Sequence, residues 1–304
     1  MLDFRVAIFA LLITGVGFAD RVAVAAPSFS HVFIVMEENR SYSEVIGSSV
    51  MPYLNMLINN YGLATQYFAN GHPSLPDYLW ITSGGNDGIT LDMCEKTSGP
   101  LNVDNAVREL NTAGVSWRAY MEDLPSVGWM GCTSGNYRQF LNPFAYYSDV
   151  VNSATQQRKI VPFSRFTTDL TSSSFARYNF ITPNLCDNMH SNPSCSNGCI
   201  GTTGTACLTA ADKWLQRNIA PLLNTNMFQP GGDGVLIIGF DEGTTRTHGG
   251  GQVAWVIVGP RVKAYRSTTF YQHQNTLRLM LEGLGVRKFP QASATATDMS
   301  EFFK

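Results

Sequence analysis

Two short apolar runs constrain the fold of this chain more than any other feature of its sequence. Residues 30–36 and 234–240 are rich in β-branched and other apolar side chains and are too short to be typical helices. Continuous apolar runs of this length are typical of strands buried on both faces, as in parallel sheets covered by helices. Each run ends in acidic residues, Glu37-Glu38 in the first and Asp241-Glu242 in the second.

Helical and strand patterns alternate along the rest of the chain. The apolar spacing predicts helices over 52–61, 103–113, 210–223 and 274–284, and further strands over 64–68, 115–120, 177–181 and 252–258. Residues 121–175 carry no pattern that assigns them. This alternation predicts an α/β fold with a mostly parallel central sheet flanked by helices. We expect a single domain over 26–304 with a loop-rich insertion that carries disulfides.

The first 25 residues resemble a secretory signal peptide. A positive residue, Arg5, precedes an apolar run over 6–18, and Ala23-Val24-Ala25 offers a cleavage site with small residues. The apolar run is shorter than the roughly 20 residues that a membrane-spanning helix needs. We therefore expect a secreted or periplasmic protein with no stable membrane span after cleavage.

The cysteine count agrees with export. Six cysteines allow up to three disulfides, and a pairing of Cys94 with Cys132 plus two bridges among the other four is one arrangement. A zinc site in the cluster of the last four is the alternative, but paired Cys-x-x-Cys units are missing. The formal net charge of −2 gives no support for nucleic-acid binding, which requires a basic patch.

Polar side chains gather where the predicted strands end. Because ligands of open α/β sheets bind outside the carboxyl ends of the strands, we expect these side chains to lie close together. Oxygen-rich clusters suit a divalent cation, and histidines also suit zinc. Singly, each residue could instead cap a helix or lie in a surface loop. The candidates are Glu38, Asn39, Asp187, His190, Asp241, Glu242 and His248.

A lone hydroxyl, Ser74, lies between Pro73 and Pro76 at the start of a predicted helix. Proline is tolerated in a first helical turn, and the free N–H groups there favour an anion. Ser74 is therefore well placed to attack a phosphate ester. The simpler interpretation is that Ser74 only caps the helix.

Four ordered motifs resemble the bacterial phosphoesterase family of acid phosphatases and phospholipases C, within the alkaline phosphatase superfamily. The motifs are Glu38-Asn39-Arg40-Ser41-Tyr42, His72-Pro73-Ser74-Leu75-Pro76-Asp77-Tyr78, Pro183 to His190, and Asp241-Glu242-Gly243. The resemblance extends from about residue 30 to the C-terminus. It implies an alkaline phosphatase-like fold and a hydrolase that acts on phosphoric esters.

The resemblance also implies roles for single residues. Glu38, Asn39, Asp241 and Glu242 match the metal-binding positions of the family, and Ser74 matches its nucleophile. His72 and His248 are candidate acid/base groups, whereas Asp77, Asp187 and His190 are candidates for a second metal or for phosphate contacts. One or two divalent ions are implied. Relatives commonly have asparagine where Asp77 stands, and a carboxylate donates no hydrogen bond to phosphate unless it is protonated.

Three functions follow in order of preference. The first is an exported, metal-dependent acid phosphatase that hydrolyses phosphate monoesters through a phosphoserine. The second is a phospholipase C-like phosphodiesterase that cleaves lipid head groups. The third is a secreted binding protein without catalytic activity on the same scaffold. The expected partner is accordingly a phosphate-ester small molecule or a phospholipid head group.

Overall fold

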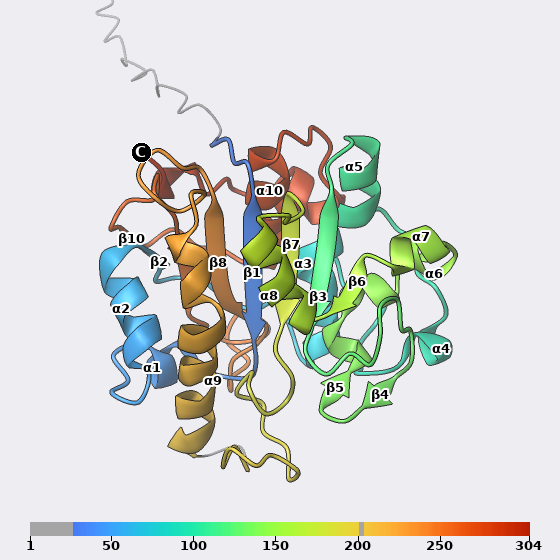
Figure 1. Ribbon diagram of the computed structural model, residues 1–304, viewed down its shortest axis with the longest axis horizontal. Helices are drawn as coiled ribbons and strands as arrows, with labels where there is room; N and C mark the ends of the chain where they lie inside the picture. Colours follow the sequence, from blue (N-terminus) through green and yellow to red (C-terminus); the bar gives the residue numbers. More distant parts are fainter. Residues whose placement is uncertain (1–26, 201–203) are drawn as a thin grey trace, which may run out of the picture.

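The computed structural model describes residues 27–200 and 204–304. Its centre is an eight-stranded sheet in the order β10-β2-β9-β8-β1-β7-β3-β6 (Figure 1). β1 pairs in parallel with β7 and β8, and β3 pairs in parallel with β7 and β6, whereas β9 is antiparallel to both its neighbours. The strands are β1 (Val32–Glu37), β2 (Gly62–Ala64), β3 (Trp117–Met121), β6 (Ile160–Pro162), β7 (Tyr178–Thr182), β8 (Val235–Phe240), β9 (Trp255–Val258) and β10 (Arg266–Ser267). The predicted mostly parallel sheet is confirmed.

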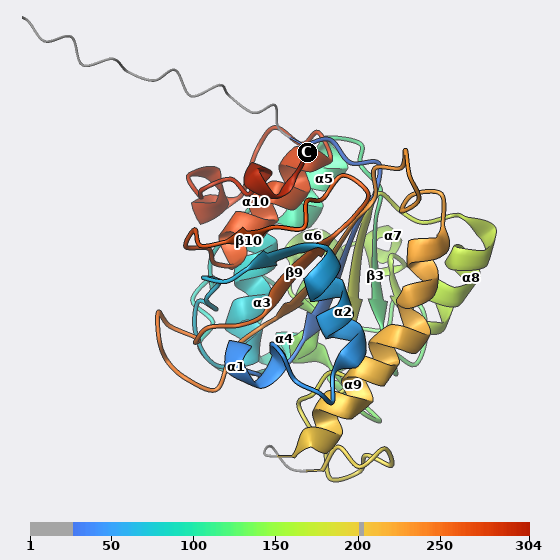
Figure 2. The same ribbon diagram turned by 90° about the vertical axis from the view of Figure 1, so that its left-hand side faces the viewer.

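Helices cover both faces of this sheet, which explains the uninterrupted apolar strands (Figure 2). One face carries α2 (Pro52–Asn60), α8 (Ser164–Ser172) and α9 (Thr205–Asn218), and the other carries α3 (Ser74–Ser83), α5 (Ala106–Thr112) and α10 (His273–Gly283). All six residues of β1 and all six of β8 are buried. Short helices lie at the periphery: α1 (Tyr42–Val45), α4 (Glu95–Ser98), α6 (Ser148–Val151) and α7 (Ala154–Gln157).

Some element boundaries differ from the predictions. The helix expected over 210–223 begins earlier, at Thr205, and ends at Asn218, and a 3₁₀ turn over Ala220–Asn224 follows. Pro221 explains the break, because proline lacks the N–H that an α-helix needs. The strand expected over 64–68 is the shorter and earlier β2, and Tyr67 and Phe68 form only isolated bridges.

The unassigned stretch over 121–175 contains real elements that its sequence does not reveal. It holds the edge strand β6, the helix α8 and a small hairpin of β4 (Thr133–Ser134) and β5 (Tyr137–Arg138). These elements are short or partly exposed, so their side chains lack a clear period.

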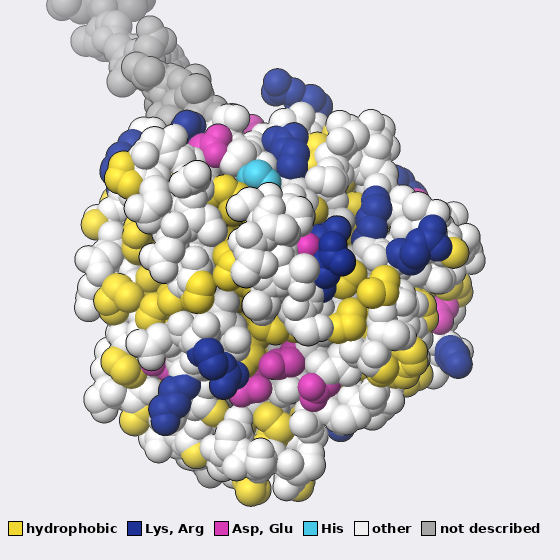
Figure 3. Space-filling view, in the orientation of Figure 1, with side chains coloured by type: hydrophobic (Ala, Val, Ile, Leu, Met, Phe, Trp, Pro, Cys, Tyr) yellow, Lys and Arg dark blue, Asp and Glu magenta, His cyan; other side chains and the backbone are white. Residues whose placement is uncertain are grey.

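Three disulfides are present, as expected, and they join Cys94 to Cys132, Cys186 to Cys195 and Cys199 to Cys207. The predicted signal peptide over 1–25 lies outside the described residues. Within the described ranges, no helix is both long enough and apolar enough to cross a bilayer. On the face seen in Figure 3, basic and acidic side chains are scattered in small groups among apolar and neutral ones.

Candidate functional site

The register of the sheet brings the two acidic strand ends together. β1 and β8 run in parallel with Glu37 opposite Phe240, so Glu38 and Asp241 leave the sheet side by side. The backbone N–H of Asn39 donates to Asp241 Oδ1 at 3.1 Å. Asn39 has a positive φ of 48°, a conformation that asparagine adopts more readily than most residues. The chain therefore turns sharply after β1 and holds the Glu38-Asn39 pair against Asp241.

Helix α3 adds Ser74 to this cluster. Ser74 is the first helical residue, follows the N-cap Pro73 and is buried. Its hydroxyl does not cap the helix but donates to Glu38 Oε2 at 3.1 Å. One turn further on, the Tyr78 hydroxyl donates to Glu38 Oε1 at 2.8 Å. Both oxygens of Glu38 are thus tied to α3, and the Ser74 Oγ faces the acidic cluster.

Burial and mutual repulsion raise the pKa values of the acidic side chains in this cluster. Burial, followed by the neighbouring Asp241, raises the pKa of Glu38 well above its usual range. Burial and the negative charge of Glu242 raise the pKa of Asp241 to about 8. The Oδ2 atom of Asp241 is buried without a hydrogen-bond partner. A bound cation would relieve each of these costs.

The donor set fits a divalent metal ion, because Glu38, Asn39, Asp241 and Glu242 offer the oxygen ligands that such ions prefer. Within residues 27–200 and 204–304, however, no three His, Cys, Asp or Glu side chains are arranged to coordinate one ion. The carboxylate of Glu242 instead contacts His72. The metal roles of the four residues therefore stay predictions, supported by an orphaned carboxylate oxygen and by crowded negative charge.

His72 connects the cluster to a neighbouring loop. Its Nδ1 lies 2.7 Å from Glu242 Oε2, and its Nε2 lies 2.8 Å from the carbonyl oxygen of Thr245. A carbonyl and an ionised carboxylate only accept hydrogen bonds, so both ring nitrogens act as donors when Glu242 is ionised. The hydrogen bond to Glu242 is the largest of the effects that raise the pKa of His72. The arrangement favours a protonated imidazole that can give up a proton.

A glycine-rich segment fixes the backbone just before His72. The N–H of Gly250 donates to the Ala69 carbonyl, and the N–H of Ala69 donates to the Gly251 carbonyl. A Cβ atom on Gly250 would lie 2.3 Å from the carbonyl oxygen of Gly71, closer than any side chain tolerates. The two backbones approach this closely only because residue 250 is glycine.

Asp77 binds the backbone of the turn before Ser74, and its role at a second metal or at phosphate stays a prediction. Its Oδ1 accepts the backbone N–H groups of Asn70, at 2.9 Å, and Gly71, at 3.0 Å. Burial, followed by Asp241 and Glu242, raises the pKa of Asp77 well above its usual range. Asp77 thus braces the turn that presents His72 and Ser74.

Sequence reasoning missed two residues in this neighbourhood. His273, which was assigned no role, is fully buried at the start of α10, and its Nε2 donates to the Asp241 carbonyl oxygen at 2.7 Å. Burial lowers the pKa of His273 to about 4, so the ring is neutral. Asp92 accepts the backbone N–H of Leu75, the residue after Ser74, at 2.9 Å. No sequence pattern marks Asp92, whereas the N-terminal position of His273 on a predicted helix was a usable signal.

Among the residues that the structure describes, no hydrogen bond joins the ring of His248 or His190 to Ser74 or Glu38. The ring of His248 packs against Phe68 and Phe270, and no hydrogen bond of this ring is found in the described part of the chain. His190 Nδ1 lies 3.0 Å from the carbonyl oxygen of Ser191. Their catalytic or binding roles stay predictions.

Asp187 belongs to a second acidic group. Its Oδ1 accepts from Asn197 Nδ2, and its charge helps to raise the pKa of the fully buried Glu37, after burial itself. Glu37 is the last residue of β1 and Glu38 follows it directly, so their side chains point to opposite sides of the sheet. Asp187 thus interacts with the carboxyl group on the opposite face from Glu38, and its role as a metal or phosphate contact also stays a prediction.

Comparison with known proteins identifies the family of this chain. The model of the phosphoesterase family matches residues 48–286. The chain belongs to the phosphoesterase family. It is accordingly a hydrolase that acts on phosphoric esters, as its four motifs predict.

Two relatives show how far this phosphoesterase resembles named proteins. A phosphatidylinositol-3-phosphatase of Mycobacterium tuberculosis is 30% identical over 283 residues, which cover 91% of this chain and 85% of the relative. A probable acid phosphatase of Kluyveromyces lactis is 31% identical over 84% of this chain, which spans 58% of that relative's length.

Solved structures show the same fold at low sequence identity. A protein of the alkaline phosphatase superfamily from Vibrio parahaemolyticus superposes with a TM-score of 0.58 and 10% identity, covering 90% of this chain and 72% of that one. The lipoteichoic acid synthase LtaP of Listeria monocytogenes superposes with a TM-score of 0.61 and 12% identity, covering 89% and 77%. The predicted alkaline phosphatase-like fold is confirmed.

Proposed function

We propose that this phosphoesterase is an exported acid phosphatase that hydrolyses phosphate monoesters through a phosphoserine at Ser74. The observation that carries the proposal is the hydrogen bond from Ser74 Oγ to Glu38 Oε2, which holds the hydroxyl against the acidic cluster. The acid phosphatase relatives support a monoester substrate. Three disulfides and the predicted signal peptide support export.

Four residues would hold a divalent ion in this enzyme, namely Glu38, Asn39, Asp241 and Glu242. Such an ion would lower the pKa of the Ser74 hydroxyl and offset the negative charge of the substrate. The buried and unpartnered Oδ2 of Asp241 supports this assignment.

In this mechanism Ser74 is the nucleophile and His72 is the proton donor. Ser74 passes its hydroxyl proton to its hydrogen-bond acceptor, Glu38 Oε2, and Ser74 Oγ attacks phosphorus. The bond from Ser74 Oγ to phosphorus forms as the bond from phosphorus to the alcohol oxygen breaks. His72, held between Glu242 and the Thr245 carbonyl, gives a proton to the departing alkoxide. Water then attacks the phosphoserine and gives a proton to the neutral His72, and the bond from Ser74 Oγ to phosphorus breaks. Inorganic phosphate leaves, and Ser74 Oγ regains its proton from Glu38. Because His72 must be protonated for its step, this mechanism favours an acidic to neutral pH.

The proposal is tested by phosphate release from p-nitrophenyl phosphate. Ser74→Ala should lower kcat by at least about a thousandfold, since it removes the nucleophile. Ser172→Ala is the matched control, because Ser172 lies exposed on α8. Acid quenching during turnover should trap a phosphate on Ser74, detectable by mass spectrometry of the tryptic peptide. Wild-type turnover in Ser74→Ala would overturn the covalent mechanism.

Bis(p-nitrophenyl) phosphate, assayed beside the monoester, separates the phospholipase C-like alternative from the proposed activity. A phosphatase should prefer the monoester, and a higher kcat/KM for the diester would reverse the assignment. If neither ester is cleaved with any added divalent metal, the result contradicts the proposed phosphatase and favours a binding protein on this scaffold.

A further inference from the structure

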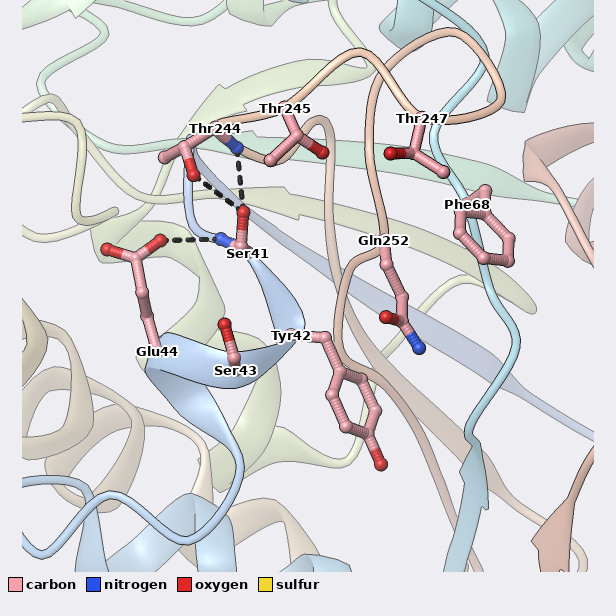
Figure 4. Close-up of a pocket in the computed structure, with 9 residues that line it drawn as sticks. All are labelled: Ser41, Tyr42, Ser43, Glu44, Phe68, Thr244, Thr245, Thr247 and Gln252. Carbon is pink, nitrogen blue, oxygen red and sulfur yellow. Dashed lines mark hydrogen bonds between the residues drawn. The ribbon is translucent and has the colours of Figure 1, made fainter.

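We infer that the alcohol portion of the natural substrate is polyhydroxylated, as in a sugar phosphate, and that it binds in a hydroxyl-lined pocket beside the acidic cluster. This inference rests on the proposed phosphatase function and adds a substrate class to it. The pocket is lined by Ser41, Tyr42, Ser43, Glu44, Phe68, Thr244, Thr245, Thr247 and Gln252 (Figure 4).

The pocket is built by the same two segments that follow the acidic strand ends. Ser41 comes two residues after Asn39, and Thr244 comes two residues after Glu242. The hydroxyls of Ser41 and Thr244 lie 2.7 Å apart, and Ser41 Oγ also accepts the N–H of Thr244. This contact joins the two segments. A ligand in the pocket therefore lies next to the loops that carry the predicted metal ligands.

His72 links the pocket wall to the reaction centre directly. The carbonyl oxygen of Thr245 accepts from His72 Nε2, while the Thr245 side chain lines the pocket. The proposed proton donor to the leaving alcohol is thus hydrogen-bonded to a residue that lines the pocket in which that alcohol would bind.

The chemistry of the lining excludes two other ligands. None of the nine lining residues is Lys, Arg or His, so the pocket offers no cation to a phosphate group. An alkyl chain would bury hydroxyls without replacing their hydrogen bonds to water, which is unfavourable. A neutral ligand with several hydroxyl groups satisfies the lining, because hydroxyls both donate and accept.

Several lining hydroxyls are available to a ligand. Within residues 27–200 and 204–304, no hydrogen bond engages the hydroxyl of Ser43, Thr245 or Thr247. Figure 4 shows the Thr245 and Thr247 hydroxyls directed toward one another, with the Gln252 side chain below them and the Phe68 ring to one side. Ser41, in contrast, is held by Thr244 and by Glu44, whose Oε2 accepts the Ser41 N–H at 2.8 Å. The wall is therefore fixed on one side and free to bind on the other.

The size of the pocket fits a small ligand. Its volume of about 290 Å³ is near the lower end of the range for pockets that hold small molecules. The Phe68 ring, which stacks on Phe270 and is almost fully buried, contributes an apolar part of the lining beside the hydroxyls.

Two substrates of similar length test the inference on the unmodified enzyme. Glucose 6-phosphate should be hydrolysed with a kcat/KM at least about tenfold higher than that of hexyl phosphate, since each neutral hydrogen bond adds a factor of a few. Equal values, or a preference for hexyl phosphate, would overturn the inference. If p-nitrophenyl phosphate is hydrolysed in the same assay, the proposed function stands whatever this ratio is, and if none of the three esters reacts, the proposed function fails instead.

A double variant locates the recognition. Thr245→Val combined with Thr247→Val removes two hydroxyls at nearly constant volume, and it should lower the ratio of kcat/KM for glucose 6-phosphate to that for hexyl phosphate about tenfold. Thr112→Val, at the exposed end of α5, is the matched control and should leave the ratio unchanged. Thermal denaturation verifies that each variant folds. A folded double variant with the wild-type ratio would contradict the assignment to this pocket.

Discussion

The carboxylate of Asp92 accepts a hydrogen bond from the backbone N–H of Leu75, the residue that follows the proposed nucleophile Ser74. Leu75 lies in the first turn of α3, where free N–H groups favour an anion. An acidic side chain from the loop that follows α3 therefore already satisfies one of the donors that would attract a phosphate group. The disulfide between Cys94 and Cys132 ties this loop to the hairpin region nearby.

We expect Asp92→Asn to strengthen substrate binding. The amide oxygen of asparagine still accepts the Leu75 N–H, while the negative charge that repels the phosphate is removed. For charges several ångströms apart in a partly solvated site, this repulsion is on the order of 1 kcal/mol, so KM should fall about fivefold. Steady-state kinetics with p-nitrophenyl phosphate and inhibition by inorganic phosphate measure the effect.

Asp233→Asn is the control for this prediction, because Asp233 precedes β8 and lies at the end of the strands opposite to Glu38 and Asp241. It removes the same charge from the molecule at a distance from Ser74. If KM and the inhibition constant for phosphate are the same in wild type and Asp92→Asn, the carboxylate does not compete with substrate.

Asp77 should tolerate an amide but not truncation. Asp77→Asn retains an oxygen that accepts from Asn70 and Gly71, and it removes a buried ionisable group whose pKa is raised. Asp77→Ala leaves two backbone N–H groups without a partner and should cost about 2–4 kcal/mol of the free energy of unfolding. Urea denaturation at neutral pH distinguishes the two variants. Equal losses in both would mean that the charge, and not the two hydrogen bonds, is what the fold requires.

The sequence predicted the centre of the fold because the central strands carry an unambiguous pattern. β1 and β8 are covered on both faces, so every residue is apolar until the acidic strand end. The sequence did not predict β6 and α8, because these elements are short or partly exposed. The sequence also did not predict that α9 begins as early as Thr205, since a Gly/Thr-rich stretch that resembles a loop precedes this residue.

The site was predictable where strand order alone brings residues together. Glu38 and Asp241 follow neighbouring parallel strands, and the approach of Ser74 agrees with its motif. Asp92 was not predictable, because it reaches α3 from an irregular loop whose path depends on tertiary packing. The placement of Asp77 against the backbone of Asn70 was not predictable from the sequence either, since a carboxylate near a nucleophile can have several roles.

Metal binding should stabilise the protein as well as activate it. A divalent ion would offset the repulsion that raises the pKa of Asp241 to about 8. Treatment with a chelator should abolish activity and lower Tm, and metal at a hundred times its dissociation constant should restore about 2.7 kcal/mol of stability. Asp241→Asn should lose most of this metal-dependent shift in Tm. If the shift persists in Asp241→Asn, the ion binds elsewhere.

The second acidic group also includes Glu122, whose charge acts on Glu37, and it should contribute to the pH dependence of the free energy of unfolding. Glu122 accepts from Trp214 Nε1 and from the backbone N–H of Asn184, and burial, together with the charge of Asp187, raises its pKa from 4.5 to about 7. Between these two values the folded protein keeps a proton that the unfolded chain has lost. The contribution of Glu122 to stability is therefore fully present below pH 4.5, and it is lost as the pH rises to about 7.

Glu122→Gln should flatten this dependence, because glutamine is neutral throughout and still offers an oxygen to one of the two donors. Between pH 4.5 and pH 8, the free energy of unfolding of the variant should rise by up to about 3 kcal/mol relative to that of wild type. This is the value of a shift of roughly 2.5 pKa units. Urea denaturation of both proteins at pH 4.5 and pH 8 measures the difference. Glu95→Gln, on the partly exposed helix α4, is the control. Parallel stability curves for wild type and Glu122→Gln would show that the folded state ionises Glu122 as readily as the unfolded chain does.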